Sequence, residues 1–141
     1  MDIVVALVGV VSALLYLGQL VSSVNFPLAQ RLGLQEKPEA IDPLTSELEL
    51  RTARWDLPTL WVAPVACGLF LADQAAWPVL ALIGGGIYVD CGGRELSKFR
   101  GLAAQGVRIG SDSERRLFSA TCVLIILIGL FLIWLGAFRT L

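Results

Sequence analysis

The sequence predicts an all-α membrane protein in which four transmembrane helices form a bundle. Hydrophobic residues make up 56% of the 141 residues, and the mean hydropathy of +0.74 is too high for an ordinary soluble domain. Apolar stretches alternate with polar connections, and the predicted spans cover about residues 3–24, 53–71, 77–90 and 117–138. No connection is long enough to separate two domains, so we expect residues 1–141 to form a single integral membrane domain.

The first predicted span covers residues 3–24. About 20 residues of helix rise roughly 30 Å, which is the thickness of the hydrocarbon core of a bilayer. A signal peptide is the alternative, but it would have a basic start, a shorter apolar run and a cleavage site with small residues. Here the early charged side chain is Asp2, and the apolar run is long. We therefore expect a retained transmembrane helix.

The second predicted span, 53–71, continues a charged helix that begins at Asp42. The Asp42 side chain can accept hydrogen bonds from free backbone N–H groups, and Pro43 at the first helical position has no N–H that would need a partner. Pro58 and Pro64 lie inside the helix, but transmembrane helices tolerate prolines when neighbours satisfy the freed carbonyls. We therefore expect no break. One face carries charged residues into the apolar stretch, namely Glu47, Arg51 and Arg54.

The third and fourth predicted spans cover residues 77–90 and 117–138. The glycine run 84–86 in the third span should allow close approach between helices. We expect residues 94–116 to form a polar, basic connection interrupted by glycines. Ser111 or Asp112 could cap the fourth helix, with Glu114 in its first turn. The fourth span contains no charged residue and is the clearest transmembrane segment of the chain.

The distribution of basic residues predicts the orientation in the membrane. Cytoplasmic connections carry an excess of lysine and arginine. All basic residues except Arg139 lie in or beside the connections between spans one and two and between spans three and four: Arg31, Lys37, Arg51, Arg54, Arg94, Lys98, Arg100, Arg108, Arg115 and Arg116. We therefore expect both of these connections to be cytoplasmic and both termini to lie on the non-cytoplasmic side.

Several classes of function are disfavoured by composition. The absence of histidine argues against His-ligated haem, most zinc sites and Ser/His or Cys/His nucleophile pairs. The three cysteines are far apart in sequence, which argues against a disulfide framework or a metal site. With 11 basic and 12 acidic residues, no overall charge favours nucleic acid as a partner. We expect no haem, no metal and no nucleic acid.

The candidate ligand-binding residues are charged groups near the cytoplasmic boundary of the spans. Together they could form a basic pocket for an anionic amphiphile, such as a carboxylate-bearing thiol, a lipid headgroup or a fatty acid. Alternatively, each arginine could extend to membrane lipids, and Glu47 could simply form a solvated pair with Arg51. Asp56 would need a partner from another helix, such as Arg94, because a charge near the membrane core is costly. The residues of this predicted pocket are Glu47, Arg51, Arg54, Asp56, Arg94, Arg100, Arg115 and Arg116.

The order of these features resembles the MAPEG family, the small membrane proteins of eicosanoid and glutathione metabolism. The shared layout comprises a helix that starts with Asp42-Pro43 and carries arginines, a third span that ends in Tyr88 followed by Gly93-Arg94, and a fourth span that is preceded by arginine. The resemblance implies a homotrimer that binds glutathione between subunits near the cytoplasmic face. It also adds Tyr88 to the candidate binding residues and makes Arg115 or Arg116 the catalytic candidate.

Three hypotheses about function follow. The first is a glutathione-dependent transferase or peroxidase, in which Arg51 or Arg54 binds the carboxylates of the thiol donor and Arg115 or Arg116 lowers the pKa of its thiol. The second is a non-catalytic scaffold or accessory subunit of a larger membrane complex. When Arg54 is aligned with the family's motif, Pro58 and Trp61 occupy its asparagine and glutamate positions, which favours the second hypothesis. The third, a small transporter, is the weakest, because no internal repeat is evident.

Overall fold

The computed structural model describes the backbone of residues 1–140 and the side chains of residues 1–138. The helices are α1 (Asp2–Val24), α2 (Phe26–Arg31), α3 (Pro43–Leu60), α4 (Val62–Leu71), α5 (Trp77–Ala104) and α6 (Asp112–Thr140). Within residues 1–140 there is no strand, so the all-α prediction is confirmed. The side chain of Arg139, the predicted exception to the charge asymmetry, lies outside the described residues.

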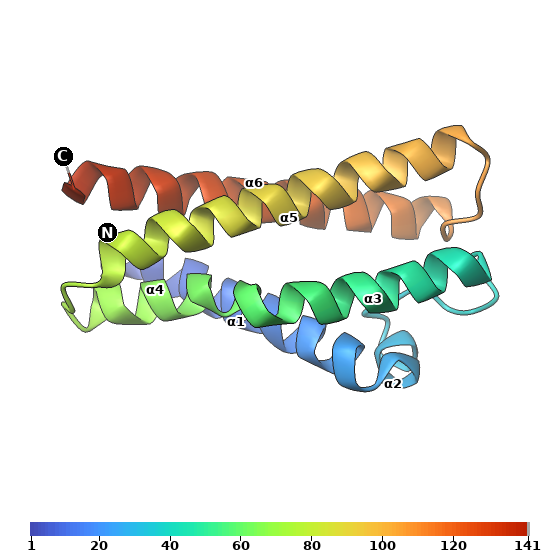
Figure 1. Ribbon diagram of the computed structural model, residues 1–141, viewed down its shortest axis with the longest axis horizontal. Coiled ribbons are helices and arrows are strands. Elements are labelled where there is room, and N and C mark those ends of the chain that lie inside the picture. The colour runs from blue at the N-terminus through green and yellow to red at the C-terminus, as the bar shows by residue number, and fades with distance from the viewer. Residues whose placement is uncertain (141) are drawn as a thin grey trace.

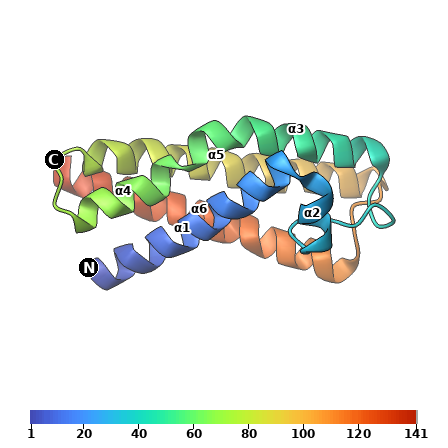
Figure 2. The same ribbon diagram turned by 90° about the horizontal axis from the view of Figure 1, so that it is seen from below.

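The helices form two closely packed groups (Figure 1). In one group α5 and α6 lie side by side along most of their length, and in the other α1 packs against α2, α3 and α4. The two groups are joined mainly where α4 packs on α5, while α3 and α5 make far less contact. Figure 2 shows α1 crossing the bundle at an angle, and both termini lie at the same end of the molecule.

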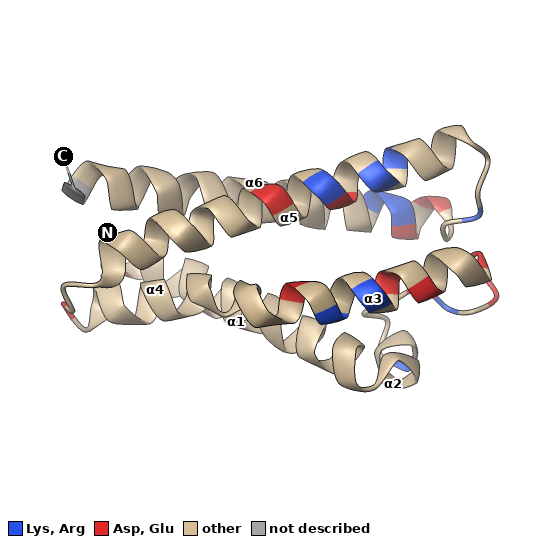
Figure 3. Cartoon of the chain, in the orientation of Figure 1, with Lys and Arg blue, Asp and Glu red and all other residues tan. Residues whose placement is uncertain are grey.

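Two helices, α1 and α6, are long and apolar enough to cross a membrane. The apolar side chains of α1 are largely exposed, and they include Ile3, Leu7, Val10, Leu14 and Leu17. Figure 3 shows that most charged residues lie in the half of the molecule that is farther from the two termini. They are on the first part of α3, the second part of α5 and the start of α6. The prediction that these charged groups lie at one end of the bundle is therefore confirmed.

The prediction of an unbroken helix from Asp42 to Leu71 is wrong. The helix is interrupted at Trp61, between α3 and α4. The physical reason is Pro64, which has no N–H to donate to the carbonyl of Leu60 and whose ring crowds that carbonyl. The hydroxyl of Tyr88 on α5 is shared between this carbonyl, at 3.5 Å, and the carbonyl of Ser12 on α1, at 3.4 Å. A neighbouring helix therefore places a polar group beside the freed carbonyl.

The prediction that residues 94–116 form a connection is wrong for residues 94–104, because α5 continues to Ala104 without interruption. Residues 94–104 are polar enough to resemble a loop, but Leu96, Phe99 and Leu102 recur at helical spacing and give the segment an apolar face. Phe99 is buried and stacks on Phe118 of α6, with ring centroids 3.8 Å apart. This tertiary contact supports the additional turns of helix.

Glycines allow close contact between the helices, as predicted. An added Cβ at Gly85 would lie 2.6 Å from the carbonyl oxygen of Gly129 on α6, and one at Gly92 would lie 2.7 Å from that of Cys122. At Gly84 it would lie 3.0 Å from the backbone of Ala63 on α4. These distances leave no room for a side chain, so α5 is held against α4 and α6 by direct backbone contact.

The two connections at the charged end are joined to each other. An isolated antiparallel bridge links Ile41 to Ile109, and both side chains are buried. The backbone N–H of Asp42 donates to the carbonyl of Arg108 at 2.9 Å, and that of Gly110 donates to the carbonyl of Ala40 at 2.8 Å. The segment before α3 and the segment before α6 therefore form one cap over this end of the bundle.

Candidate functional site

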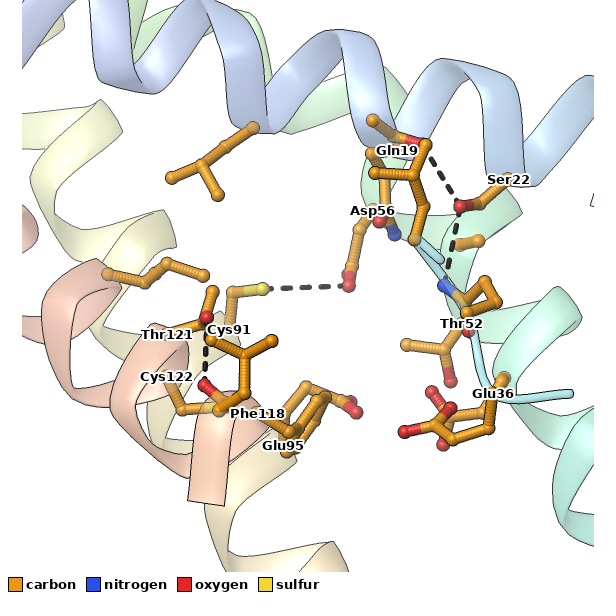
Figure 4. A pocket seen from close by; sticks show the side chains of 18 of the residues that line it. Gln19, Ser22, Glu36, Thr52, Asp56, Cys91, Glu95, Phe118, Thr121 and Cys122 are labelled. Carbon is orange, nitrogen blue, oxygen red and sulfur yellow. Dashed lines mark hydrogen bonds between the residues drawn. The ribbon is translucent and has the colours of Figure 1, made fainter. Parts of the chain in front are cut away.

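A cavity of about 440 Å³ lies between α1, α3, α5 and α6, beneath the connection that follows α2. This volume is typical of a small-molecule pocket. The cavity forms where α3 and α5 diverge, at the charged end of the bundle, and Figure 4 shows the side chains that project into it. Its inner end is apolar and is lined by Leu14, Leu15, Leu60 and Ile125. Its outer end carries the charged side chains Glu36, Lys37 and Glu114, together with Leu34, Leu117 and Phe118.

Asp56, which is buried, forms an ion pair with the partly exposed Arg94 at the wall of the pocket. Asp56 is 5% exposed, and the Nη2 atom of Arg94 lies 2.6 and 2.8 Å from its two carboxylate oxygens. The thiol of Cys91 donates to the same carboxylate at 3.7 Å. A carboxylate buried without a partner would be very unfavourable, so the pairing explains how Asp56 is tolerated on the inner face of α3. The prediction that Asp56 requires Arg94 from another helix is confirmed.

Lys98 lies between two further buried carboxylates, one on each side of the pocket. Its Nζ atom is 2.8 Å from Oε1 of Glu49 on α3 and forms a second ion pair with Glu95, one turn earlier on α5. Nζ of Lys98 and Oε1 of Glu49 are both buried, so water screens their attraction poorly. Two carboxylates therefore share one ammonium group.

Burial governs the ionisation of this cluster. It raises the pKa of Glu49 to about 6, and the nearby Lys98 only partly opposes that effect. Burial lowers the pKa of Lys98, but its ion pairs with Glu49 and Glu95 outweigh burial, and the net pKa is raised. Lys98 therefore remains charged at neutral pH.

Sequence reasoning missed Glu49, Glu95 and Lys98. A signal was present, because Glu49 and Asp56 are seven residues apart and share one helical face with Ala53 and Leu60, all of which are buried. The signal was obscured because Glu47 and Arg51, on the neighbouring face, form an obvious i,i+4 pair.

The remaining polar groups at the outer end come from α1 and from the connection after α2. The Nε2 atom of Gln35 donates to the hydroxyl of Ser22 at 3.3 Å, and that of Gln30 donates to the backbone carbonyl of Glu36 at 2.9 Å. The Glu36 carboxylate is half-buried, and burial raises its pKa. Figure 4 shows Glu36 and Glu95 on opposite sides of the polar end.

The structure brings only some of the predicted site residues to this pocket. Asp56 and Tyr88 line it, and Arg94 reaches it through Asp56. Arg51 is exposed and pairs with Glu47 at 2.6 Å, and the side chain of Arg54 is also exposed. The other predicted arginines lie elsewhere: Arg100 and Arg116 are exposed, Arg115 pairs with Asp112, and Arg115 and Arg116 border a separate depression.

Within one chain, the pocket is therefore lined by more acidic than basic side chains. The ionisable side chains that line it are Glu36, Lys37, Glu49, Asp56, Glu95 and Glu114. Most of the predicted arginines do not line it, and Arg51, Arg54, Arg100 and Arg116 are exposed at the surface. Across the described residues, no three histidine, cysteine or carboxylate side chains are grouped so that they could hold a metal ion.

No family model matches the chain, and no curated protein or solved structure is significantly similar to it. The pocket itself is thus the basis for a function. An apolar inner end and an outer end with carboxylate, amide and hydroxyl groups suit a molecule with the same division, which is an amphiphile.

Proposed function

We propose that this chain is an integral membrane protein of four spans that binds an amphiphilic small molecule in the pocket between α1, α3, α5 and α6. The spans are α1, the end of α3 together with α4, the first half of α5, and α6. The observation that carries the proposal is the division of the pocket into an apolar inner end and a polar outer end. An amphiphile buries its apolar part against the former and pairs its head group with the latter.

The position of the pocket supports access from the bilayer. Leu14 of α1 and Leu117 of α6 both line the pocket, yet they are 63% and 68% exposed, so the pocket reaches the surface between these two helices. These are also the two helices that are long and apolar enough to cross a membrane. A lipophilic ligand that is dissolved in the membrane would therefore meet the pocket directly.

The orientation follows from the charges. The charged end, with the two joined connections, is placed in the cytoplasm, because it carries nearly all of the basic residues. The exposed apolar side chains of α1 then face lipid, and both termini lie on the opposite side of the membrane.

A glutathione-dependent enzyme with the MAPEG layout is the second candidate. It is favoured by the exposure of Arg51, whose side chain is 74% exposed, and of Arg54. In a homotrimer a glutathione carboxylate could bind these residues between subunits, with Arg115 or Arg116 lowering the pKa of its thiol. Gly86 and Gly93 on α5 have open space beside them and would allow a second subunit to approach closely.

The test of the main proposal uses the purified protein in a nonionic detergent and a panel of ten-carbon amphiphiles: decanol, decanoate and decylamine. A ligand at about 100 times its Kd raises the free energy of unfolding by about 2.7 kcal/mol. We expect at least one probe to raise the unfolding temperature of the wild type and of Ala120→Trp, an exposed position on α6. Thr121→Trp, which fills the pocket, should abolish the shift. The proposal is wrong if no probe acts or if Thr121→Trp responds like the wild type.

The second candidate is tested separately. Native mass spectrometry should show a trimer, and millimolar glutathione should raise the unfolding temperature of the wild type but not of Arg51→Gln combined with Arg54→Gln. A monomer that does not respond to glutathione excludes this candidate and leaves the accessory-subunit hypothesis in its place.

A further inference from the structure

Most of the amide and hydroxyl side chains that line the pocket are hydrogen-bonded to other parts of the chain. The hydrogen-bonded ones are Ser22, Gln30, Gln35, Tyr88 and Thr121. The exceptions are Gln19 on α1 and Thr52 on α3, whose side chains form no hydrogen bond within the described part of the chain. Both side chains are half-buried. The pocket therefore contains two neutral polar groups that lack a partner from the protein.

Gln19 lies in α1, which is long and apolar enough to cross a membrane. It follows Leu15, which lines the apolar end of the pocket, by one helical turn. A free amide is unfavourable at this depth, because little water is present to form hydrogen bonds with it. Polar side chains of membrane helices ordinarily form hydrogen bonds with another helix. The Gln19 amide lines the cavity instead, so its missing partner is expected from a ligand.

Thr52 adds a second free group on the same side of the cavity. Figure 4 shows Gln19 and Thr52 on one side, and Thr121 and Cys122 of α6 on the other. The Thr121 hydroxyl donates to the carbonyl four residues earlier in its helix, whereas the Thr52 hydroxyl does not. An amide and a hydroxyl each donate and accept hydrogen bonds. A head group that lies beside them should therefore also do both.

The charged side chains beside these groups are already paired with one another. Asp56 pairs with Arg94, and Lys98 pairs with both Glu49 and Glu95. An anionic head group would meet more carboxylates than cations, and a cationic one would compete with Arg94 and Lys98 for their carboxylates. Moving a charge out of water costs far more than moving a neutral polar group. This arrangement favours an uncharged head group.

We infer that the ligand of this pocket is an uncharged lipid whose head group, a hydroxyl or a carboxamide, lies between Gln19 and Thr52. Its apolar chain lies against Leu15, Leu60 and Ile125. This inference rests on the proposed binding of an amphiphile in the pocket. A hydroxyl or carboxamide supplies both a donor and an acceptor, so it provides the hydrogen bonds that the two side chains lack and adds no charge.

The experiment compares five probes with a ten-carbon chain on the purified full chain: decanol, decanamide, decyl methyl ether, decanoate and decylamine. The ether is uncharged but donates no hydrogen bond, and the last two are charged at about pH 7.5. Affinities are obtained from the dependence of the unfolding temperature on probe concentration, with Thr121→Trp as the reference for binding outside the pocket. We expect decanol and decanamide to bind about 5-fold or more tightly than each of the other three.

Two variants remove the hydrogen-bonding groups with little change of shape. Gln19→Met and Thr52→Val should each weaken the binding of decanol and decanamide about 5-fold and so remove their advantage over the ether. Both keep a side chain of similar size, so the fold should tolerate them. Thr59→Val is the matched control, because Thr59 is an exposed residue of α3 that does not line the pocket, and it should bind decanol like the wild type.

The outcomes separate this inference from the proposed function. Tightest binding of decylamine or decanoate in the pocket, or equal binding of decanol and the ether, would overturn the inference and leave the pocket proposal intact. An unchanged affinity for decanol in Gln19→Met, or equal effects of the Thr52 and Thr59 variants, would also overturn it. If no probe binds in a way that Thr121→Trp abolishes, both proposals fail.

Discussion

Replacing Gly85 by alanine tests the close contact between α5 and α6, on which the shape of the pocket depends. The added Cβ would lie 2.6 Å from the carbonyl oxygen of Gly129, and 2.8 and 2.9 Å from Cγ1 and the backbone nitrogen of Ile133. Two of these three atoms are backbone atoms, so a side-chain rotation cannot relieve the clash. The two helices would have to separate.

The magnitude follows from two opposing effects. Overpacking of a tight interior costs about 1 to 3 kcal/mol. Replacing glycine by alanine inside a helix is favourable by up to about 1 kcal/mol when nothing clashes. The neighbouring Gly86 has nothing within 4 Å of an added Cβ, so Gly86→Ala gains the second effect without the first. We therefore expect Gly85→Ala to be less stable than Gly86→Ala by about 1 to 3 kcal/mol.

The assay is unfolding by SDS in mixed micelles, followed by the fluorescence of the four tryptophans. Gly101→Ala is a second control, because it also has open space and lies nearer the polar end of α5. Each variant should also be shown to have the same oligomeric state as the wild type, because Gly86 is exposed and could contact a second subunit. If Gly85→Ala is as stable as both controls, the close contact of α5 with α6 is refuted.

Two further predictions concern the charged cluster. Asp56→Asn should lower the free energy of unfolding by about 1 to 3 kcal/mol in the same assay, because it removes the buried carboxylate that accepts hydrogen bonds from Arg94. Asp90→Asn removes only an exposed pair with Arg94 and should change stability by less than about 0.5 kcal/mol, so equal costs would argue against a buried pair. Burial raises the pKa of Glu49 from 4.5 to about 6, so the folded state binds more protons than the unfolded state between these values. The wild type should therefore lose about 2 kcal/mol relative to Glu49→Gln as the pH rises through this window, whereas a constant difference from pH 4 to pH 7 would contradict the shift.

The starts of α3 and α6 follow local rules and could be predicted from sequence. Oδ1 of Asp42 accepts a hydrogen bond from the N–H of Leu44 at 2.9 Å, as expected for a capping aspartate. At the start of α6, Glu114 accepts from the N–H of Ser111 at 2.7 Å, while the Ser111 hydroxyl accepts from the N–H of Glu114. This reciprocal arrangement involves only residues within one turn, so it needs no knowledge of the fold.

The end of α5 and the break at Trp61 required tertiary information. Residues 94–104 are polar on average, and hydropathy alone does not reveal that Phe99 stacks on Phe118. Pro64 is compatible with either a kinked or an interrupted helix. The interruption is favoured because Tyr88, which comes from a different helix, is placed to satisfy the free carbonyl of Leu60.

The sequence by itself determined the all-helical fold, the gathering of charged residues at one end and the need of Asp56 for a partner. These features depend on composition, on periodicity and on the unfavourable burial of a single charge. Only the tertiary structure decided that Glu49, Glu95 and Lys98 meet, and that the predicted arginines remain outside the pocket. The charge of a pocket depends on which faces of separate helices turn inward, and that is set by packing contacts such as Gly85 with Gly129, which are distant in sequence.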